Sequence, residues 1–77
     1  MPRYYFHLLN GSERNDDPEG CELPNDKLAI IEATTAAREM VVEAVLQGAP
    51  VGRLAFEVVD QDNRLIVELP FISVVRE

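Results

Sequence analysis

Cysteine, histidine, tryptophan and long apolar runs are scarce or absent in this sequence of 77 residues, and each scarcity excludes something. The single cysteine, Cys21, cannot form an internal disulfide, which fits a reducing cytoplasm. The single histidine, His7, leaves a zinc site short of ligands, so we expect no metal. No stretch approaches the roughly 18 apolar residues of a membrane span, and the run after Arg3 is too short for a signal peptide. We therefore expect a cytoplasmic protein without a leader or a membrane contact.

Basic residues are also few, at 7 against 14 acidic ones, which gives a formal net charge of −7. A surface of this sign repels phosphate backbones, so we expect no nucleic-acid binding. A nucleic-acid interface would need Arg3, Arg53 and Arg64 to cluster in space. Solubility alone explains the charge most simply, and a charged partner, if there is one, should be a basic protein.

The first third of the chain predicts a hairpin. Residues 3–9 read as a strand that is apolar on both faces, as in the centre of a sheet, because Tyr4, Phe6 and Leu8 alternate with Tyr5, His7 and Leu9. Asn10-Gly11 predicts a turn, residues 12–17 a polar hairpin loop, and residues 20–23 a short second strand. Pro18 argues against a longer strand, since it cannot donate to a ladder.

Residues 27–47 predict one long helix, with no Gly or Pro and many strong helix formers. Asn25 or Asp26 can cap its start, and Gly48 suits its end. A stripe of mainly small residues should let this helix lie close to a sheet: Ala29, Ala33, Ala36, Ala37, Met40 and Ala44, widened by Ile30, Val41 and Val45. Val42 and Leu46 lie near the wet face, where they either pack under a loop or join a self-association patch. Packing under a loop is the favoured expectation.

Residues 53–59 and 64–69 predict two more strands, joined by a polar turn at residues 60–63. Pro70 interrupts the last strand, and the apolar tail that begins at Phe71 should dock on the fold. The first strand should join this C-terminal hairpin in one sheet. We therefore predict a single α+β domain over residues 1–77: a two-layer ββαββ arrangement with a small, mostly antiparallel sheet and the long helix on one face.

Chemistry-bearing residues do not form a catalytic set. Ser12 has no nucleophile elbow, Cys21 has no nearby cation, and no Gly-rich phosphate loop is present, so we predict neither an enzyme nor a cofactor. The acidic groups at residues 16–19 and 60–63 are only fragments of a calcium loop. If His7, Glu57 and Glu68 share one sheet face, a His–carboxylate pair could act as a general base, although a structural hydrogen bond is the commoner role. With Tyr5 they form the candidate binding face: Tyr5, His7, Glu57 and Glu68.

Several of these segments resemble a known family. Its members are small alphaproteobacterial, rhizobia-like proteins classed as a domain of unknown function. The resemblance rests on Pro2-Arg3-Tyr4-Tyr5-Phe6-His7-Leu8, on the Asn10-Gly11 turn, and on Asp17 through Gly20 to Glu22-Leu23. Asn10 stands where an Asp is usual, and Pro18 precedes Glu19. The resemblance implies a fold and a bacterial cytoplasmic origin, and it supplies no activity, cofactor or catalytic residues.

The small size of the chain bears on its function. A domain of this length buries only about 60% of its unfolded surface, so association is a common source of further stability. We therefore expect a non-enzymatic interaction or accessory module that self-associates as a homodimer. The alternative is a small-molecule or metal-ion binding protein, conceivably an enzyme, that uses the candidate binding face.

Overall fold

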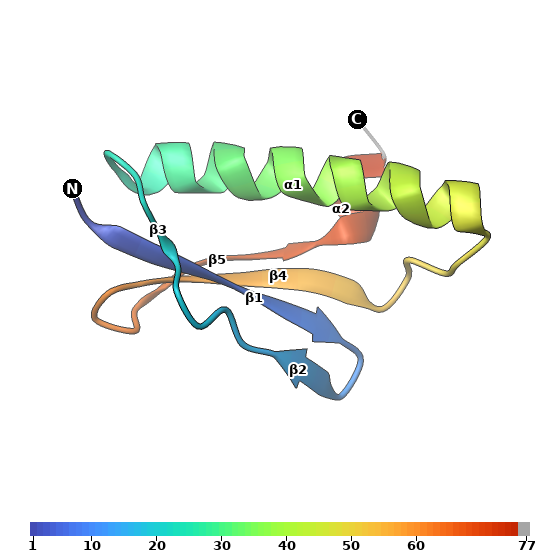
Figure 1. Cartoon of the computed structure of the whole chain (residues 1–77), viewed down its shortest axis with the longest axis horizontal. Helices are drawn as coiled ribbons and strands as arrows, with labels where there is room; N and C mark the ends of the chain where they lie inside the picture. The colour runs from blue at the N-terminus through green and yellow to red at the C-terminus, as the bar shows by residue number, and fades with distance from the viewer. Residues whose placement is uncertain (76–77) are drawn as a thin grey trace.

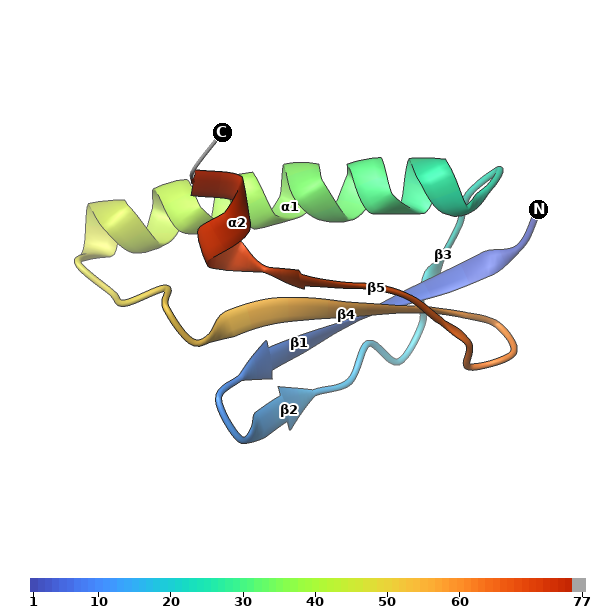
Figure 2. The same ribbon diagram turned by 180° about the vertical axis from the view of Figure 1, so that it is seen from behind.

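One antiparallel sheet carries both helices on the same face (Figures 1 and 2). The computed structural model describes residues 1–75, with the strand order β2-β1-β4-β5 and with β3 pairing β1 beside β2. The elements in chain order are β1 (Arg3–Asn10), β2 (Glu13–Asn15), β3 (Cys21–Glu22), α1 (Asp26–Gln47), β4 (Leu54–Asp60), β5 (Leu65–Pro70) and α2 (Phe71–Val75). The α+β fold is confirmed, as is the central position of the first strand.

The first hairpin is tighter than the sequence suggested. β2 occupies residues 13–15, so the prediction of a loop over residues 12–17 is wrong there. Asn10 pairs with Glu13, which leaves Gly11 and Ser12, rather than Asn10 and Gly11, as the central turn residues. Gly11 has φ 63°, and a glycine at the first central position is typical of a type II′ turn. A two-residue turn returns the chain to the ladder at once, which is why β2 forms.

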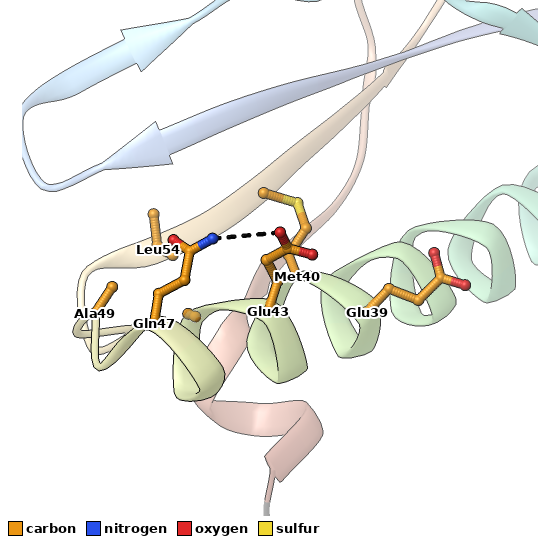
Figure 3. Close-up of a pocket in the computed structure, with 7 residues that line it drawn as sticks. Glu39, Met40, Glu43, Gln47, Ala49 and Leu54 are labelled. Carbon is orange, nitrogen blue, oxygen red and sulfur yellow. Dashed lines mark hydrogen bonds between the residues drawn. The ribbon is translucent and has the colours of Figure 1, made fainter.

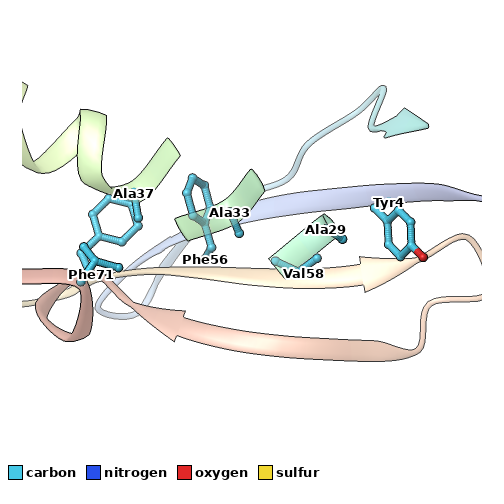
Figure 4. Packing of buried hydrophobic residues seen from close by; sticks show 8 residues of the cluster. Tyr4, Ala29, Ala33, Ala37, Phe56, Val58 and Phe71 are labelled. Atoms are coloured by element: carbon cyan, nitrogen blue, oxygen red, sulfur yellow. The ribbon is translucent and has the colours of Figure 1, made fainter. Parts of the chain in front are cut away.

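The core lies between α1 and the sheet. Asn25 caps α1 by accepting the Leu28 N–H at 2.9 Å, and Gly48 ends it in the left-handed conformation. Figure 4 shows the small side chains of α1 over the large ones of the sheet and α2. The helix residues Ala29, Ala33 and Ala37 are fully buried and pack with Tyr4, Phe56, Val58 and Phe71. Short alanine side chains let the helix axis approach the strands, as predicted.

The C-terminal hairpin ends against the core. β4 and β5 each lie one residue further along than predicted, and Pro70 is the last residue of β5 rather than an interruption. The apolar tail docks as expected and forms α2, in which Phe71 and Val74 are buried. The Phe71 ring lies 5.1 Å from that of Phe56, measured between centroids. Aromatic contact therefore fixes the tail to the sheet.

The outer face of α1 departs from the predictions. Val42 and Leu46 expose 60% and 82% of their surface, so the expectation that they pack under a loop is wrong. Val45 is 67% exposed and does not widen the sheet-facing stripe, and Ile30 is only partly covered. Because α1 lies as the outer layer over the sheet, the side of the helix that points away from the strands stays open.

Candidate functional site

The sheet face opposite α1 holds all four residues of the candidate binding face. Tyr4, whose side chain packs in the core, points toward the helix, so Tyr5 and His7 point away from it. The strand register then places His7 opposite Glu57, and Glu57 opposite Glu68, in one row across β1, β4 and β5. The structure thus brings the histidine and both carboxylates onto one face.

His7 is nevertheless covered, with only 9% of its surface exposed. Its Nδ1 accepts a hydrogen bond from the backbone N–H of Asp17 at 3.0 Å, and the Tyr5 ring stacks against it with centroids 6.3 Å apart. A nitrogen that accepts an N–H holds no proton, so the neutral ring carries its proton on Nε2. Nδ1 of His7 is therefore used to hold the loop at Asp17. It does not form a hydrogen bond with Glu57.

Glu57 is paired with an arginine that the sequence did not single out. Arg14 of β2 places Nη1 2.6 Å from the Glu57 carboxylate and Nε 2.6 Å from that of Asp16. The hydrogen bonds to Asp16 and Glu57 raise the pKa of Arg14. The residue was missed because residues 12–17 were predicted as a loop. A two-residue turn after β1 is the signal that could have placed Arg14 on a neighbouring strand.

Asp17 fills a gap in the sheet. Along one edge of β1, the pairing with β2 stops at Leu8 and the pairing with β3 stops at Tyr4. The Phe6 N–H lies between these two positions and has no strand partner. The Asp17 carboxylate accepts that N–H at 3.2 Å and also accepts the N–H groups of Gly20 and Glu19, at 3.1 and 3.3 Å. Burial alone would raise its pKa, but the backbone donors prevail and the pKa of Asp17 is lowered.

Gly20 is required by the same loop. Its φ is +66°, and a Cβ built there would lie 2.5 Å from the Tyr4 carbonyl oxygen and 2.9 Å from the Tyr5 ring. Any side chain therefore collides with the backbone of β1. The Asp17-x-x-Gly20 spacing thus has a structural explanation. Asp17 anchors the loop to β1, and Gly20 lets the loop lie close to β1. Within residues 1–75, no three His, Cys, Asp or Glu side chains gather as metal ligands would.

A shallow hollow of about 440 Å³ opens beside His7 on this face. It is lined by Tyr5, His7, Arg14, Asp16, Asp17, Val59, Asp60, Gln61 and Asn63. Glu57 and Glu68 are not among its lining residues, so the hollow covers only half of the candidate binding face. Its lining offers one cationic group and several hydrogen-bonding groups, which suits a small polar ligand.

A second network joins the sheet to the start of α1. The Tyr4 hydroxyl donates to the Asp26 carboxylate at 2.7 Å, and this bond with burial raises the pKa of Tyr4 to about 12. Arg64 lies 3.7 Å from Asp26 and 3.1 Å from Asp60. The pKa of Asp60 is lowered, and the main cause is the hydrogen bond that its carboxylate accepts from the backbone N–H of Arg64. These contacts position the hairpin turn and leave Arg64 neutralised.

The three arginines needed for a basic patch do not form one. Arg3 is 3.5 Å from the Glu22 carboxylate, and Arg64 is paired with Asp26 and Asp60. Arg53 lies beside Gly11 at the other end of the sheet. The expectation that no cation lies near Cys21 is wrong, because Arg3 is close enough to act on its thiol; burial, with Glu32 and Asp17 nearby, outweighs Arg3 and raises the pKa of Cys21.

A different hollow, of about 350 Å³, lies between the end of α1 and the start of β4 (Figure 3). Met40, Ala49 and Leu54 contribute apolar surface, and the carboxylates of Glu39 and Glu43 stand along the helix side. The Gln47 amide donates to Glu43 at 3.3 Å. Apolar walls with an acidic rim suit a positively charged side chain with an aliphatic stem.

Comparisons with known proteins give a family and no activity. No helix in the described part of the chain is long and apolar enough to cross a membrane. Neither the comparison with curated proteins nor the one with solved structures finds a match. A family model described as a domain of unknown function, DUF6894, matches residues 3–72, from β1 into α2. The chain therefore belongs to the family of the domain of unknown function DUF6894.

Proposed function

We propose that this domain is a non-enzymatic interaction module that self-associates as a homodimer. The observation that carries the proposal is the apolar outer face of α1, where Val42, Val45 and Leu46 are mostly exposed. Fully burying one aliphatic side chain is worth about 1.5–3 kcal/mol, so covering these three favours association by several kcal/mol. A small domain with an alanine-lined core gains from such added burial.

The state of the polar groups supports a role without catalysis. His7 uses its basic nitrogen on the Asp17 N–H, and Glu57 is neutralised by Arg14. A general base needs a free lone pair within reach of a substrate proton, and His7 does not offer one on Nδ1. The raised pKa of Cys21 favours the thiol over the reactive thiolate.

Light scattering after gel filtration tests self-association. The purified full chain is measured from low to high micromolar concentration, because a weak dimer dissociates on dilution. We expect a mass of two chains at the upper end and a shift toward one chain on dilution. A mass of one chain throughout the series would refute self-association.

A second candidate function is small-molecule or metal-ion binding on the Tyr5, His7, Glu57 and Glu68 face. The hollow of about 440 Å³ beside His7 favours it, because Arg14 adds a cationic group there. A thermal-shift screen of metal ions and polar metabolites tests it, with Arg14→Gln as the matched variant. Stabilisation that Arg14→Gln abolishes would favour binding, and no response in the screen would count against it.

The remaining parts of the proposal concern context. The acidic rim of Glu39 and Glu43 around an apolar hollow supports a basic protein partner over an acidic one. The lone cysteine supports a cytoplasmic location. The N-terminal motif supports an origin among alphaproteobacterial proteins. Pull-down with the wild type and with a Glu39→Lys/Glu43→Lys variant, in matched salt, separates a basic partner from nonspecific binding.

A further inference from the structure

The outer face of α1 carries a heptad pattern. Six residues follow one another at alternating spacings of three and four: Leu28, Ile31, Thr35, Arg38, Val42 and Val45. All six are exposed, and four of them are large and apolar. Val42 comes nine residues after the buried Ala33 and so lies on the opposite side of a helix with 3.6 residues per turn. This is the spacing by which one helix packs along another.

We propose that a second copy of this chain covers the stripe, with the two α1 helices antiparallel about a two-fold axis between Thr35 and Arg38. This inference rests on the proposed self-association and specifies its interface. In this register Ile31 lies opposite Val42 of the second copy, and Leu28 lies opposite Val45. The two polar residues, Thr35 and Arg38, then lie opposite each other at the centre. The interface is isologous, as a closed dimer requires.

The position of Arg38 on the stripe favours the antiparallel direction. A parallel, in-register pair would set Arg38 against Arg38 at the centre of the seam, where like charges repel. In the antiparallel pair Arg38 lies one helical turn from Glu32 of the second copy, within reach of an arginine side chain. None of the salt bridges within residues 1–75 involves Arg38, so its guanidinium is available for that contact.

The available area indicates a weak dimer. The four apolar stripe residues, together with Leu46, which lies one turn after Val42 beside the stripe, have exposed fractions that amount to roughly three whole aliphatic side chains, or about 300 Å² of apolar surface per copy. Because apolar atoms make up about 60% of such interfaces, the pair would bury about 1,000 Å² in total. That lies at the lower end of specific complexes, so dissociation on dilution is expected.

Cysteine cross-linking tests the register. Ile31→Cys and Val42→Cys are prepared separately in a Cys21→Ser background, one with a tag that changes its mass, and each is oxidised with glutathione disulfide alone and as an equimolar mixture. We expect cross-linked dimers only in the mixture, because residue 31 meets residue 42 of the other copy. Cross-linking of each variant with itself would mean parallel helices and would overturn the inference.

Light scattering on the reduced wild type separates the two proposals. A dimer without the mixed cross-link overturns the helix seam and leaves self-association standing, with the exposed edge of β5 as the next interface to test. A monomer at every concentration overturns both proposals.

The matched pair Arg38→Glu and Arg53→Glu makes the same charge change on and off the seam. We expect Arg38→Glu to weaken dimerisation by about tenfold or more and Arg53→Glu to change it little; equal effects would contradict the role of Arg38.

Discussion

Replacing Gly20 by alanine should strongly destabilise the protein, because the new Cβ atom brings two separate costs. The first is conformational: the left-handed backbone at φ +66° costs a residue with a Cβ about 1–2 kcal/mol. The second is steric, since the new Cβ would lie 2.5 Å from the Tyr4 carbonyl oxygen and 2.9 Å from the Tyr5 ring. The oxygen belongs to the backbone of β1, so it cannot rotate aside as a flexible side chain could.

Gly48→Ala separates these two costs. Gly48 has nearly the same conformation, at φ +70°, but a Cβ there meets nothing within 4 Å. We expect Gly48→Ala to cost about 1 kcal/mol from backbone strain alone. Gly20→Ala should cost about 3 kcal/mol or more, since forcing atoms into a packed site typically adds about 1–3 kcal/mol. A domain of this length has a total stability of only about 4–12 kcal/mol, so the larger loss is readily measured.

Urea unfolding followed by circular dichroism gives both values under one set of conditions. The comparison requires equal denaturant slopes in the two variants, so that the difference in midpoint reports stability. Equal losses for Gly20→Ala and Gly48→Ala would refute the close approach of the loop to β1. A loss at Gly48 larger than at Gly20 would refute the assignment of strain as well.

Three further predictions concern protons. The folded-state pKa of Asp17 is lowered, so its contribution to stability is full above the ordinary value of about 3.9 and is lost as the pH falls through the lower folded value; acid unfolding of Asp17→Asn should depend less steeply on pH in that range than wild type. Phenolate absorbance should show Tyr4 titrating near 12, and Asp26→Asn should bring that value down toward 10; no shift would contradict the Tyr4–Asp26 bond. Nitrogen-15 NMR of the neutral imidazole should show His7 as the Nε2–H tautomer, and the Nδ1–H form would contradict its bond to the Asp17 amide.

Local signals placed most of the secondary structure. The helix could be predicted to within one residue because its interior has no Gly or Pro, while Asn25 and Gly48 supply caps whose geometry is local. β4 and β5 were found within one residue for a similar reason, since alternating apolar residues flank a polar turn. β2 was missed because its residues, Glu13, Arg14 and Asn15, are all exposed and polar. Only its pairing with β1 makes it a strand.

For the candidate binding face, the sequence could predict only that its side chains point to the same side of the sheet. Strand periodicity and the hairpin order put His7, Glu57 and Glu68 on one face. Periodicity could not show that Arg14 would neutralise Glu57, or that the Asp17 amide would engage His7. Those contacts join residues 10 and 43 positions apart in the chain, and their geometry depends on the path of the loop that carries Asp17 and on the pairing of β2.

The sequence alone determined the α+β class and the long helix with its alanine stripe, because these depend on residue type and spacing along the chain. The tertiary structure decided that the apolar residues on the outer side of α1 are left open while the histidine is covered. The physical reason is that burial is a property of packing: a helix has two sides, the sheet covers one of them, and no sequence pattern within the helix states whether anything covers the other.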